Sequence, residues 1–297
     1  MIKYITEFLK ELEFEESDRI DIAIAYEKIA ASPNAAGALT EIVRGYEKDN
    51  SFITMDSYKY VEKMAREAGV HPYVAELITH ICLSKTLKER LLKLGFSKKN
   101  VLFTLSDYKI KAYECKRLYG IIGVERWLWY VIFYELRIIG IGRLQFEMRE
   151  FQIGTYRKGG KMIKKHDTVL SIHIPRTGTP LDQRACQKAY AEAKEVFCGL
   201  LGCENIPFYC SSWLLYHKHR EFLDEKSNIV KFMNNFEILK YEDYQDGNSG
   251  LYKFLFEKEN GTPIEQLPTD TTLRASYAAH MANGGKTGFG TGIFFLE

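Results

Sequence analysis

The sequence has no long apolar run and little net charge. Its most apolar stretch, residues 127–134, is flanked by charged residues and is too short to cross a bilayer. The net charge of +2 over 297 residues provides no overall field that would attract nucleic acid or an anionic membrane. The first residues lack the basic start and apolar core of a signal peptide. These absences predict a cytoplasmic protein that binds neither membranes nor nucleic acid.

The six cysteines include no CxxC pair. Cys198 and Cys203 are separated by four residues, and no histidine stands beside them at zinc-ligand spacing. We therefore expect buried free thiols in a reducing compartment and no metal site. His217 and His219 could also be metal ligands, but histidines spaced in this way are more often exposed loop residues.

What is present divides the chain into two halves with different periodicity. Apolar residues recur at helical spacing in residues 17–31, 35–46, 57–68, 72–94, 109–119 and 124–138. From Gly140 onward the spacing changes, and apolar and polar residues alternate in residues 144–151. We predict an all-helical N-terminal domain over residues 1–138. We predict a second domain over residues 139–297, in which a mixed β-sheet is flanked by helices, an α+β or α/β fold.

The second half predicts an ordered series of elements. Strands are expected at residues 144–151, 161–165, 169–174, 208–215, 251–256 and 292–296, and helices at residues 180–201, 227–239 and 271–282. The glycine pair at 159–160 indicates a hairpin. The basic residues around it are typical of solvated surface.

The strand, turn and helix at residues 169–197 form the most informative segment. The turn contains Gly178, and Thr179, Pro180 and Asp182 suit an N-cap, a first-turn proline and an acidic residue near a capping box. Backbone amides at such a helix start can bind a phosphate or another anion. An ordinary capped helix needs the same residues, so the segment alone leaves both interpretations open.

Longer segments carry a family resemblance. They are GRLQFEMREF (142–151), HIPRTGTPL (173–181), CSSWLL (210–215), KSNIVKF (226–232) and LRASYAAHMANGGKTGFGTGIFF (273–295). Together with the order of elements, they resemble the GNAT acyltransferases. They are similar in particular to a bacterial family that joins a helical acyltransferase-associated N-terminal domain to a GNAT-like C-terminal domain. The resemblance covers most of the chain.

The resemblance implies an acyl-CoA co-substrate, acetyl-CoA in the first place, and no metal. In GNAT enzymes two parallel strands splay apart and the pantetheine arm lies between them, which here would be residues 169–174 and 208–215. The cofactor-binding residues that this implies are Ser171, Ile174, Arg176, Thr177, Gly178, Thr179 and Ser211. Amides of residues 176–179 would hold the pyrophosphate, and Arg176 would add a cation.

The phosphate loop departs from the usual GNAT signature, which is Arg or Gln, two residues, Gly, any residue, then Gly or Ala. The sequence Arg176-Thr177-Gly178-Thr179-Pro180 is one residue shorter and has a single glycine, and its proline lacks an amide proton. Two alternatives to an active enzyme therefore stay open. One is a catalytically inactive GNAT-derived module that binds CoA or a small ligand for regulation. The other is an unrelated α/β ligand-binding protein.

The resemblance also implies direct attack of an amine, on a small molecule or a peptide, on the thioester, helped by a base and an acid. Glu147 and His173 lie on the polar sides of two strands that we expect to be neighbours, and either is a candidate base. Glu147 could instead pair with Arg149, and His173 could bond a loop carbonyl. Tyr216 is the candidate acid, with Tyr241 as the alternative. The oligomeric state stays open.

Overall fold

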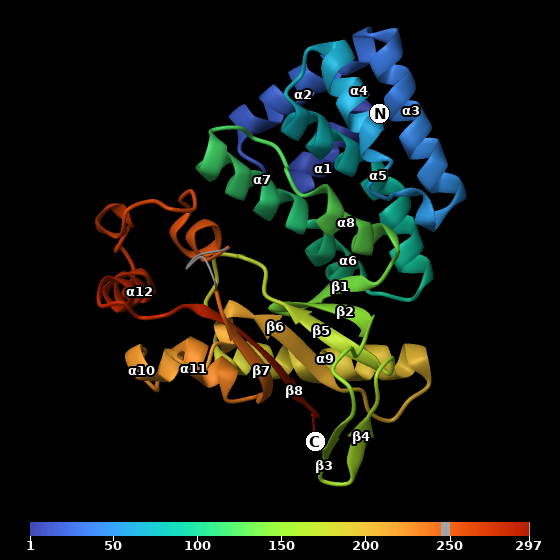
Figure 1. Ribbon diagram of the computed structural model, residues 1–297. Helices are drawn as coiled ribbons and strands as arrows, with labels where there is room; N and C mark the ends of the chain where they lie inside the picture. Colours follow the sequence, from blue (N-terminus) through green and yellow to red (C-terminus); the bar gives the residue numbers. More distant parts are fainter. Residues whose placement is uncertain (245–249, 297) are drawn as a thin grey trace. The chain divides into compact units, whose positions relative to one another are not determined.

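The computed structural model describes residues 1–244 and 250–296. The chain divides into two compact units, Met1–Gly140 and Ile141–Glu297. The first unit is helical (Figure 1) and contains α1 (Ile2–Glu11), α2 (Glu16–Ala31), α3 (Pro33–Lys48), α4 (Tyr58–Ala68), α5 (Pro72–Lys93), α6 (Lys98–Leu105), α7 (Asp107–Tyr119) and α8 (Trp127–Tyr134). Helices α1 and α6 were not among the predicted elements, and α8 is shorter than predicted.

Local sequence signals define the ends of these helices. The Ser32 side chain accepts a hydrogen bond from the backbone of α3, and Pro33 occupies the first turn. Gly69 and Gly120 end α4 and α7 in the left-handed conformation. Helix α5 is buried over a continuous run of ten residues, 75–84, so it forms the core of this unit.

A mixed sheet has the strand order β1-β2-β5-β6-β8-β7, and its strands from β2 onward belong to the second unit. Its strands are β1 (Ile138–Ile141), β2 (Leu144–Glu150), β5 (Thr168–His173), β6 (Phe208–Ser212), β7 (Glu237–Asp243) and β8 (Gly288–Phe294). Strands β5 and β6 are parallel, whereas β2 with β5, β6 with β8, and β7 with β8 are antiparallel. A separate hairpin consists of β3 (Tyr156–Lys158) and β4 (Lys161–Ile163).

Helix α9 (Gln183–Leu201) covers one face of this sheet (Figure 1). Its Tyr190 ring contacts Phe146, Phe208 and Phe294, on three different strands. On the opposite face, the β3–β4 hairpin packs Tyr156 and Ile163 into a cluster with residues of β5, β6 and β8. Because strand residues alternate between faces, the odd-numbered residues of β2 and β5, among them Glu147, Ser171 and His173, lie on the face opposite α9.

The segment after β6 differs from the prediction. Strand β6 stops at Ser212, because the Ser212 side chain accepts a hydrogen bond from Leu214 and residues 213–215 form a 3-10 turn, η2 (Trp213–Leu215). The short α10 (His219–Phe222) follows. The predicted helix at 227–239 is too long, because α11 (Asn228–Met233) ends at an Asn234 cap and the chain continues as β7.

The predicted strand at 251–256 is wrong. These residues form one π-helical turn, η3 (Tyr252–Phe256), and Tyr252, Leu255 and Phe256 belong to an apolar cluster with Tyr277 of α12 (Thr272–Ala282). A helical turn buries these apolar side chains as well as a strand with alternating side chains would. A further 3-10 turn, η4 (Ile264–Gln266), lies between η3 and α12.

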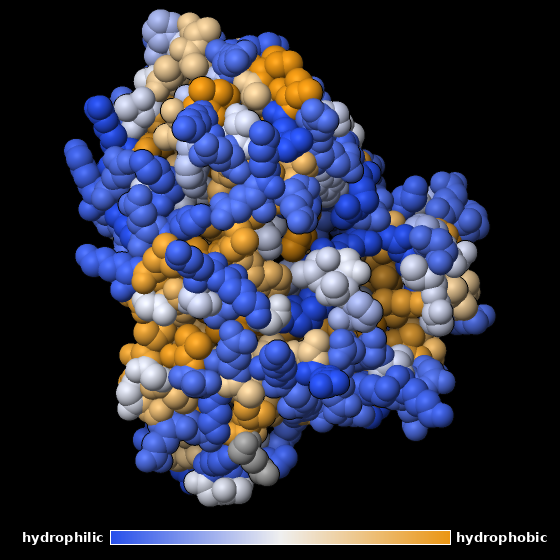
Figure 2. All heavy atoms as spheres, turned by 180° about the vertical axis from the view of Figure 1, so that it is seen from behind, coloured by the Kyte–Doolittle hydropathy of each residue, from blue (hydrophilic) through white to orange (hydrophobic). Residues whose placement is uncertain are grey.

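Within the residues described, no helix is both long and apolar enough to span a membrane. Hydrophilic side chains cover most of the face seen in Figure 2, and apolar side chains reach it in separate patches. Cys82, Cys115, Cys186 and Cys210 are buried as expected, but Cys198 and Cys203 are only half-buried. His219 is fully buried, so the expectation of an exposed loop histidine was wrong for that residue.

Candidate active site

Strands β5 and β6 run side by side for a short distance only. Their parallel ladder pairs Leu170 with Phe208 and Ser171 with Tyr209, and in the described chain it has no further pair. Strand β5 nevertheless continues to His173, and β6 continues to Ser212 while it pairs with β8. A gap between the carboxyl ends of two parallel strands exposes backbone groups that a ligand can bind.

The predicted cofactor-binding residues on these strands lie beside this gap. Ser171 is buried and stands opposite Glu147 of β2. Ile174, the residue after β5, is half-buried. On β6, the Ser211 hydroxyl lies 3.0 Å from the Thr291 hydroxyl of β8. Ser171 and Ser211 thus lie on the two strands that separate.

The two candidate bases contact each other. Nε2 of His173 lies 2.9 Å from Oε2 of Glu147, a diagonal contact between β5 and β2. The side chains are 26% and 9% exposed, so solvent reaches the pair. A carboxylate at Nε2 favours the tautomer with the proton there, which leaves Nδ1 as the basic nitrogen. The alternative partner of Glu147, Arg149, has its guanidinium 5.7 Å from the ring centre of Tyr209.

The loop after β5 differs from the predicted helix start. The N-cap of α9 is Asp182, which accepts a hydrogen bond of 2.9 Å from the Ala185 amide. The prediction that Thr179 caps the helix and that Pro180 occupies its first turn was therefore wrong. Thr177 and Thr179 instead hold each other through their hydroxyls, 2.7 Å apart. The amides of residues 176–179 consequently precede the helix rather than begin it.

Arg143, which the sequence reasoning did not single out, holds this loop. Its guanidinium donates hydrogen bonds to the carbonyl oxygens of Pro175 (2.8 Å), Thr179 (3.0 Å) and Pro180 (3.2 Å). In a planar trans peptide the N–H group points away from the carbonyl. Because the Pro175 and Pro180 carbonyls point toward Arg143, the amides of Arg176 and Leu181 point away from Arg143.

Gly142, which precedes Arg143, is the sequence feature that could have drawn attention to this segment. Gly142 has φ of +62°, and an added Cβ would come within 3.1 Å of Ala189 on α9. The conformation favours glycine at this position, and the close approach of α9 leaves little room for a side chain. Gly178 in the loop also has a positive φ, +78°, but open space surrounds its Cβ position. The backbone conformation of the loop therefore explains the glycine at position 178, and crowding does not.

Arg176 already has a counter-charge. Its guanidinium lies 2.7 Å from Glu257, which follows η3, and Glu257 also binds Arg274 of α12 at 3.0 Å. Arg274 contacts Asp270 as well, at 2.9 Å. The cation expected to meet a phosphate is therefore shared with a carboxylate, and a phosphate at this loop competes with Glu257 for it.

Tyr216 is buried after η2 and donates a hydrogen bond of 2.6 Å to Asp243 of β7. Burial and the Asp243 carboxylate raise the pKa of Tyr216. Lys286 also binds Asp243, at 2.9 Å. The hydrogen bond from Tyr216, and after it that from Lys286, lowers the pKa of the Asp243 carboxyl. This geometry keeps the proton on the Tyr216 oxygen, which donates it in the hydrogen bond to Asp243. Tyr241, the alternative acid, is exposed, and the His217 ring packs against it.

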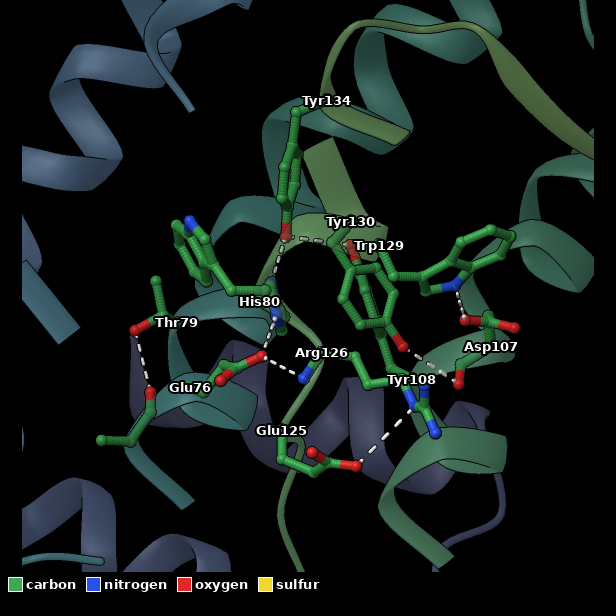
Figure 3. A network of polar contacts seen from close by, with 12 residues as sticks. Glu76, Thr79, His80, Asp107, Tyr108, Glu125, Arg126, Trp129, Tyr130 and Tyr134 are labelled. Atoms are coloured by element: carbon green, nitrogen blue, oxygen red, sulfur yellow. Dashed lines mark hydrogen bonds and ion pairs between the residues drawn. The ribbon is translucent and has the colours of Figure 1, made fainter. Parts of the chain in front are cut away.

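A second polar cluster lies in the helical unit and is shown in Figure 3. Nδ1 of His80 lies 2.6 Å from the Tyr134 hydroxyl, and Nε2 lies 3.4 Å from Glu76. Glu76 also accepts a hydrogen bond from the Arg126 amide, at 2.9 Å. His80, Glu76 and Tyr134 are fully buried, and burial lowers the pKa of His80. A substrate has no access to these groups, so the cluster is not a candidate active site.

Comparisons with known proteins identify the family of both halves of the chain. Residues 138–294 match the family model of the GNAT-like C-terminal domain, and residues 3–136 match that of the N-acyltransferase N-terminal domain. A comparison with curated proteins gave no match.

Solved structures of an acyltransferase are similar over 98% of this chain and 87% of theirs, with 21% sequence identity and a TM-score of 0.75. One holds decanoyl-CoA and teicoplanin, one is a mutant with octanoyl-CoA, and one holds CoA and 10C-teicoplanin. At this identity the likeness establishes the fold.

Proposed function

The chain belongs to the family of N-acyltransferases with a GNAT-like C-terminal domain, and on this premise we propose that it transfers an acyl group from acyl-CoA to an amine by direct attack. The observation that carries this proposal is the separation of β5 and β6 beyond Ser171 and Tyr209. The gap ends at the loop of residues 174–180, whose carbonyls Arg143 draws to one side. Strand edges and loop amides together suit an extended ligand with an anionic end.

The residues of the gap have proposed roles toward CoA. Ser171, Ile174 and Ser211 flank the pantetheine arm. At the pyrophosphate, Gly178 contributes its amide, and Thr177 and Thr179 contribute their hydroxyls, because the Thr177 amide already donates to the Pro175 carbonyl and the Thr179 amide to the Thr177 hydroxyl. Arg176 exchanges Glu257 for a phosphate oxygen when the ligand binds, because both are anionic partners of the same guanidinium. CoA itself supplies an activated thioester.

In the reaction, the amine nitrogen bonds to the thioester carbonyl carbon and the carbon–sulfur bond breaks, which gives an amide and the CoA thiol. Glu147 and His173 act as one unit that takes the proton from the amine, with His173 Nδ1 as the accepting atom and Glu147 fixing the tautomer. Tyr216 is the proposed acid. Its bond to Asp243 makes it a weak acid, so the sulfur leaves as the thiolate and afterwards takes a proton, from Tyr216 or from water, to give the CoA thiol.

The acyl donor and the acceptor that we propose are supported by the resemblance and by the similar structures. Acetyl-CoA is the donor that the GNAT resemblance implies, whereas the similar structures hold octanoyl-CoA and decanoyl-CoA. The acceptor is an amine on a small molecule or a peptide-like compound, as teicoplanin in a similar structure illustrates. A donor assay therefore includes both the shortest and the longer chains.

The test is thermal unfolding with CoA, acetyl-CoA and decanoyl-CoA, followed by measurement of thiol release with a panel of amines. A ligand at 100 times its Kd stabilises the fold by about 2.7 kcal/mol, a shift of roughly 2–4 °C at this size. A shift with amine-dependent thiol release supports the transferase. A shift without release from any amine favours a regulatory CoA-binding module, and no shift in a folded sample overturns CoA binding.

A further inference from the structure

The C-terminal end of α9 carries two cysteines in contact. Their sulfur atoms lie 3.5 Å apart, and both side chains are half-buried. The other four cysteines, Cys82, Cys115, Cys186 and Cys210, are buried. Cys198 and Cys203 are thus the thiols that a small reagent reaches in the folded protein.

Backbone geometry produces this contact. Gly202 ends α9 in the left-handed conformation, with φ of +65°, and the Cys203 amide donates a hydrogen bond of 3.2 Å to the Cys198 carbonyl. This is the six-to-one bond of a Schellman motif, in which the side chains of the two bonded residues normally make an apolar contact. Here both positions are cysteine, so the motif holds two thiols together. The pairing is local and independent of the candidate active site.

We propose that Cys198 and Cys203 form a dithiol site that a low-molecular-weight disulfide oxidises to an intramolecular disulfide. A sulfur–sulfur bond is about 2.05 Å long, so the sulfurs must approach by about 1.5 Å from their separation of 3.5 Å. Rotation about the two side-chain χ1 angles covers such a distance. The backbone hydrogen bond already keeps the two residues together, so the helix end need not unfold.

The reaction proceeds by two thiol–disulfide exchanges. The Cys203 thiolate attacks one sulfur of the oxidant RS–SR, which forms Cys203–S–SR and releases RS⁻. The Cys198 thiolate then attacks the Cys203 sulfur, which forms the ring and releases the second RS⁻. The two protons lost by the protein end on two RSH molecules, so the dithiol is oxidised and the oxidant is reduced.

The order of attack follows from the surroundings of the two thiols. Burial and the neighbouring Cys203 raise the pKa of Cys198 to about 11, so this thiol is a poor first nucleophile near neutral pH. We assign the first step to Cys203 and the resolving step to Cys198, and single variants test this order. Such reversible disulfides are the kind found in reducing compartments.

The experiment uses the folded full-length chain and oxidised glutathione. After incubation, the protein is unfolded in urea with iodoacetamide and its mass is measured. The expected result is four alkylated cysteines of the six present, no attached glutathione, and return to six after reduction. Cys210→Ser is the matched control, because it removes a buried cysteine of the same tryptic peptide and should still close the ring.

Single variants test the order of attack. Cys198→Ser should retain one glutathione on Cys203, and Cys203→Ser should react several-fold more slowly. Six alkylated cysteines in the wild type, a stable glutathione adduct without ring closure, or a covalent dimer would each overturn the proposal. The wild-type experiment and the control leave both proposed cysteines unchanged, so the test does not depend on whether the Cys198 and Cys203 variants fold.

Discussion

Each unit of the molecule contains a contact between a glutamate and a histidine, and the two contacts differ in solvent access. In the helical unit, His80 and Glu76 are 3.4 Å apart with side chains 0% and 2% exposed. In the sheet unit, His173 and Glu147 are 2.9 Å apart and partly open. The same residue types therefore serve packing in one unit and are available for proton transfer in the other. Residue identity alone does not locate a catalytic base, because the base must also be accessible to solvent and substrate.

The buried pair should give the largest effect on stability. Glu76→Leu leaves the His80 ring and the Arg126 amide without their acceptor, so the free energy of unfolding should fall by about 3–5 kcal/mol. Urea unfolding measures the change, and Glu76→Gln is the control, because it keeps an acceptor oxygen. A loss below about 1 kcal/mol for Glu76→Leu would contradict a structural role for the cluster.

The partly open pair should show the opposite behaviour. Glu147→Gln should reduce kcat about 100-fold, the usual scale for impairing a general base and equal to about 2.7 kcal/mol, because a neutral amide no longer stabilises the charge that His173 gains when it takes the proton. The free energy of unfolding should change little, since the amide keeps the shape and can still contact His173. Single-turnover thiol release and urea unfolding measure the two quantities. Wild-type turnover would remove Glu147 from the mechanism.

Arg143 tests whether the phosphate loop depends on its carbonyl contacts. Arg143→Met removes all three donors and should raise the Kd of CoA about tenfold or more, since a hydrogen bond from a charged group is worth about 1.5–3 kcal/mol. Calorimetry with CoA and with pantetheine, which lacks the pyrophosphate, separates this effect from a general loss of structure. Arg143→Lys should lie between. Equal weakening of both ligands would count against a specific role in the loop.

Two glycines with the same backbone conformation allow a matched comparison between the units. Gly178 in the loop and Gly120 after α7 have φ of +78° and +70°, and an added Cβ meets nothing at either position. Valine at either position should cost about 1–3 kcal/mol of stability, because a β-branched residue strains there. Gly178→Val should also weaken CoA binding about tenfold, roughly 1.4 kcal/mol. CoA affinity unchanged by Gly178→Val, or weakened equally by Gly120→Val, would contradict the loop assignment.

The smallest effect is a pH dependence that both units share. Burial lowers the pKa of His80, and it lowers that of His219 in the sheet unit to about 4. Both are neutral in the folded state, and the unfolded chain takes up their protons below about pH 6.5. Stability should therefore fall as the pH falls, by at most about 1.36 kcal/mol per pH unit for each histidine. Urea unfolding of the wild type and of His80→Gln measures the slope, and an identical slope would exclude His80.

The two halves differ in how much of them the sequence predicts. Helical periodicity locates most helices of the first unit, because their apolar stripes are long and their ends carry caps such as Ser32 and Gly120. In the second unit, Thr179, Pro180 and Asp182 are all good helix starters, and the fold uses Asp182. Local sequence signals do not show which of the three begins the helix, because the hydrogen bonds from Arg143 to the Thr179 and Pro180 carbonyls keep these two residues in the loop.

Other features depend on contacts between distant segments. Arg143 and Glu257 hold the candidate phosphate loop from positions far away in sequence, which no spacing rule reveals. The misassigned strand at 251–256 illustrates the same limit, because a short apolar segment suits a strand or a helical turn until its partners are known. The contact between Glu147 and His173, in contrast, follows from alternation once β2 and β5 are neighbours.

The place of β8 has a consequence for the synthesis of the protein. Strand β8 lies between β6 and β7, and among the described strands β7 pairs only with β8. During translation, the helical unit can fold as it leaves the ribosome. The sheet, however, stays incomplete until residues 288–294 have emerged, which separates the maturation of the two units in time. Nascent chains stalled before these residues should therefore resist protease in the helical half and be cut in the other.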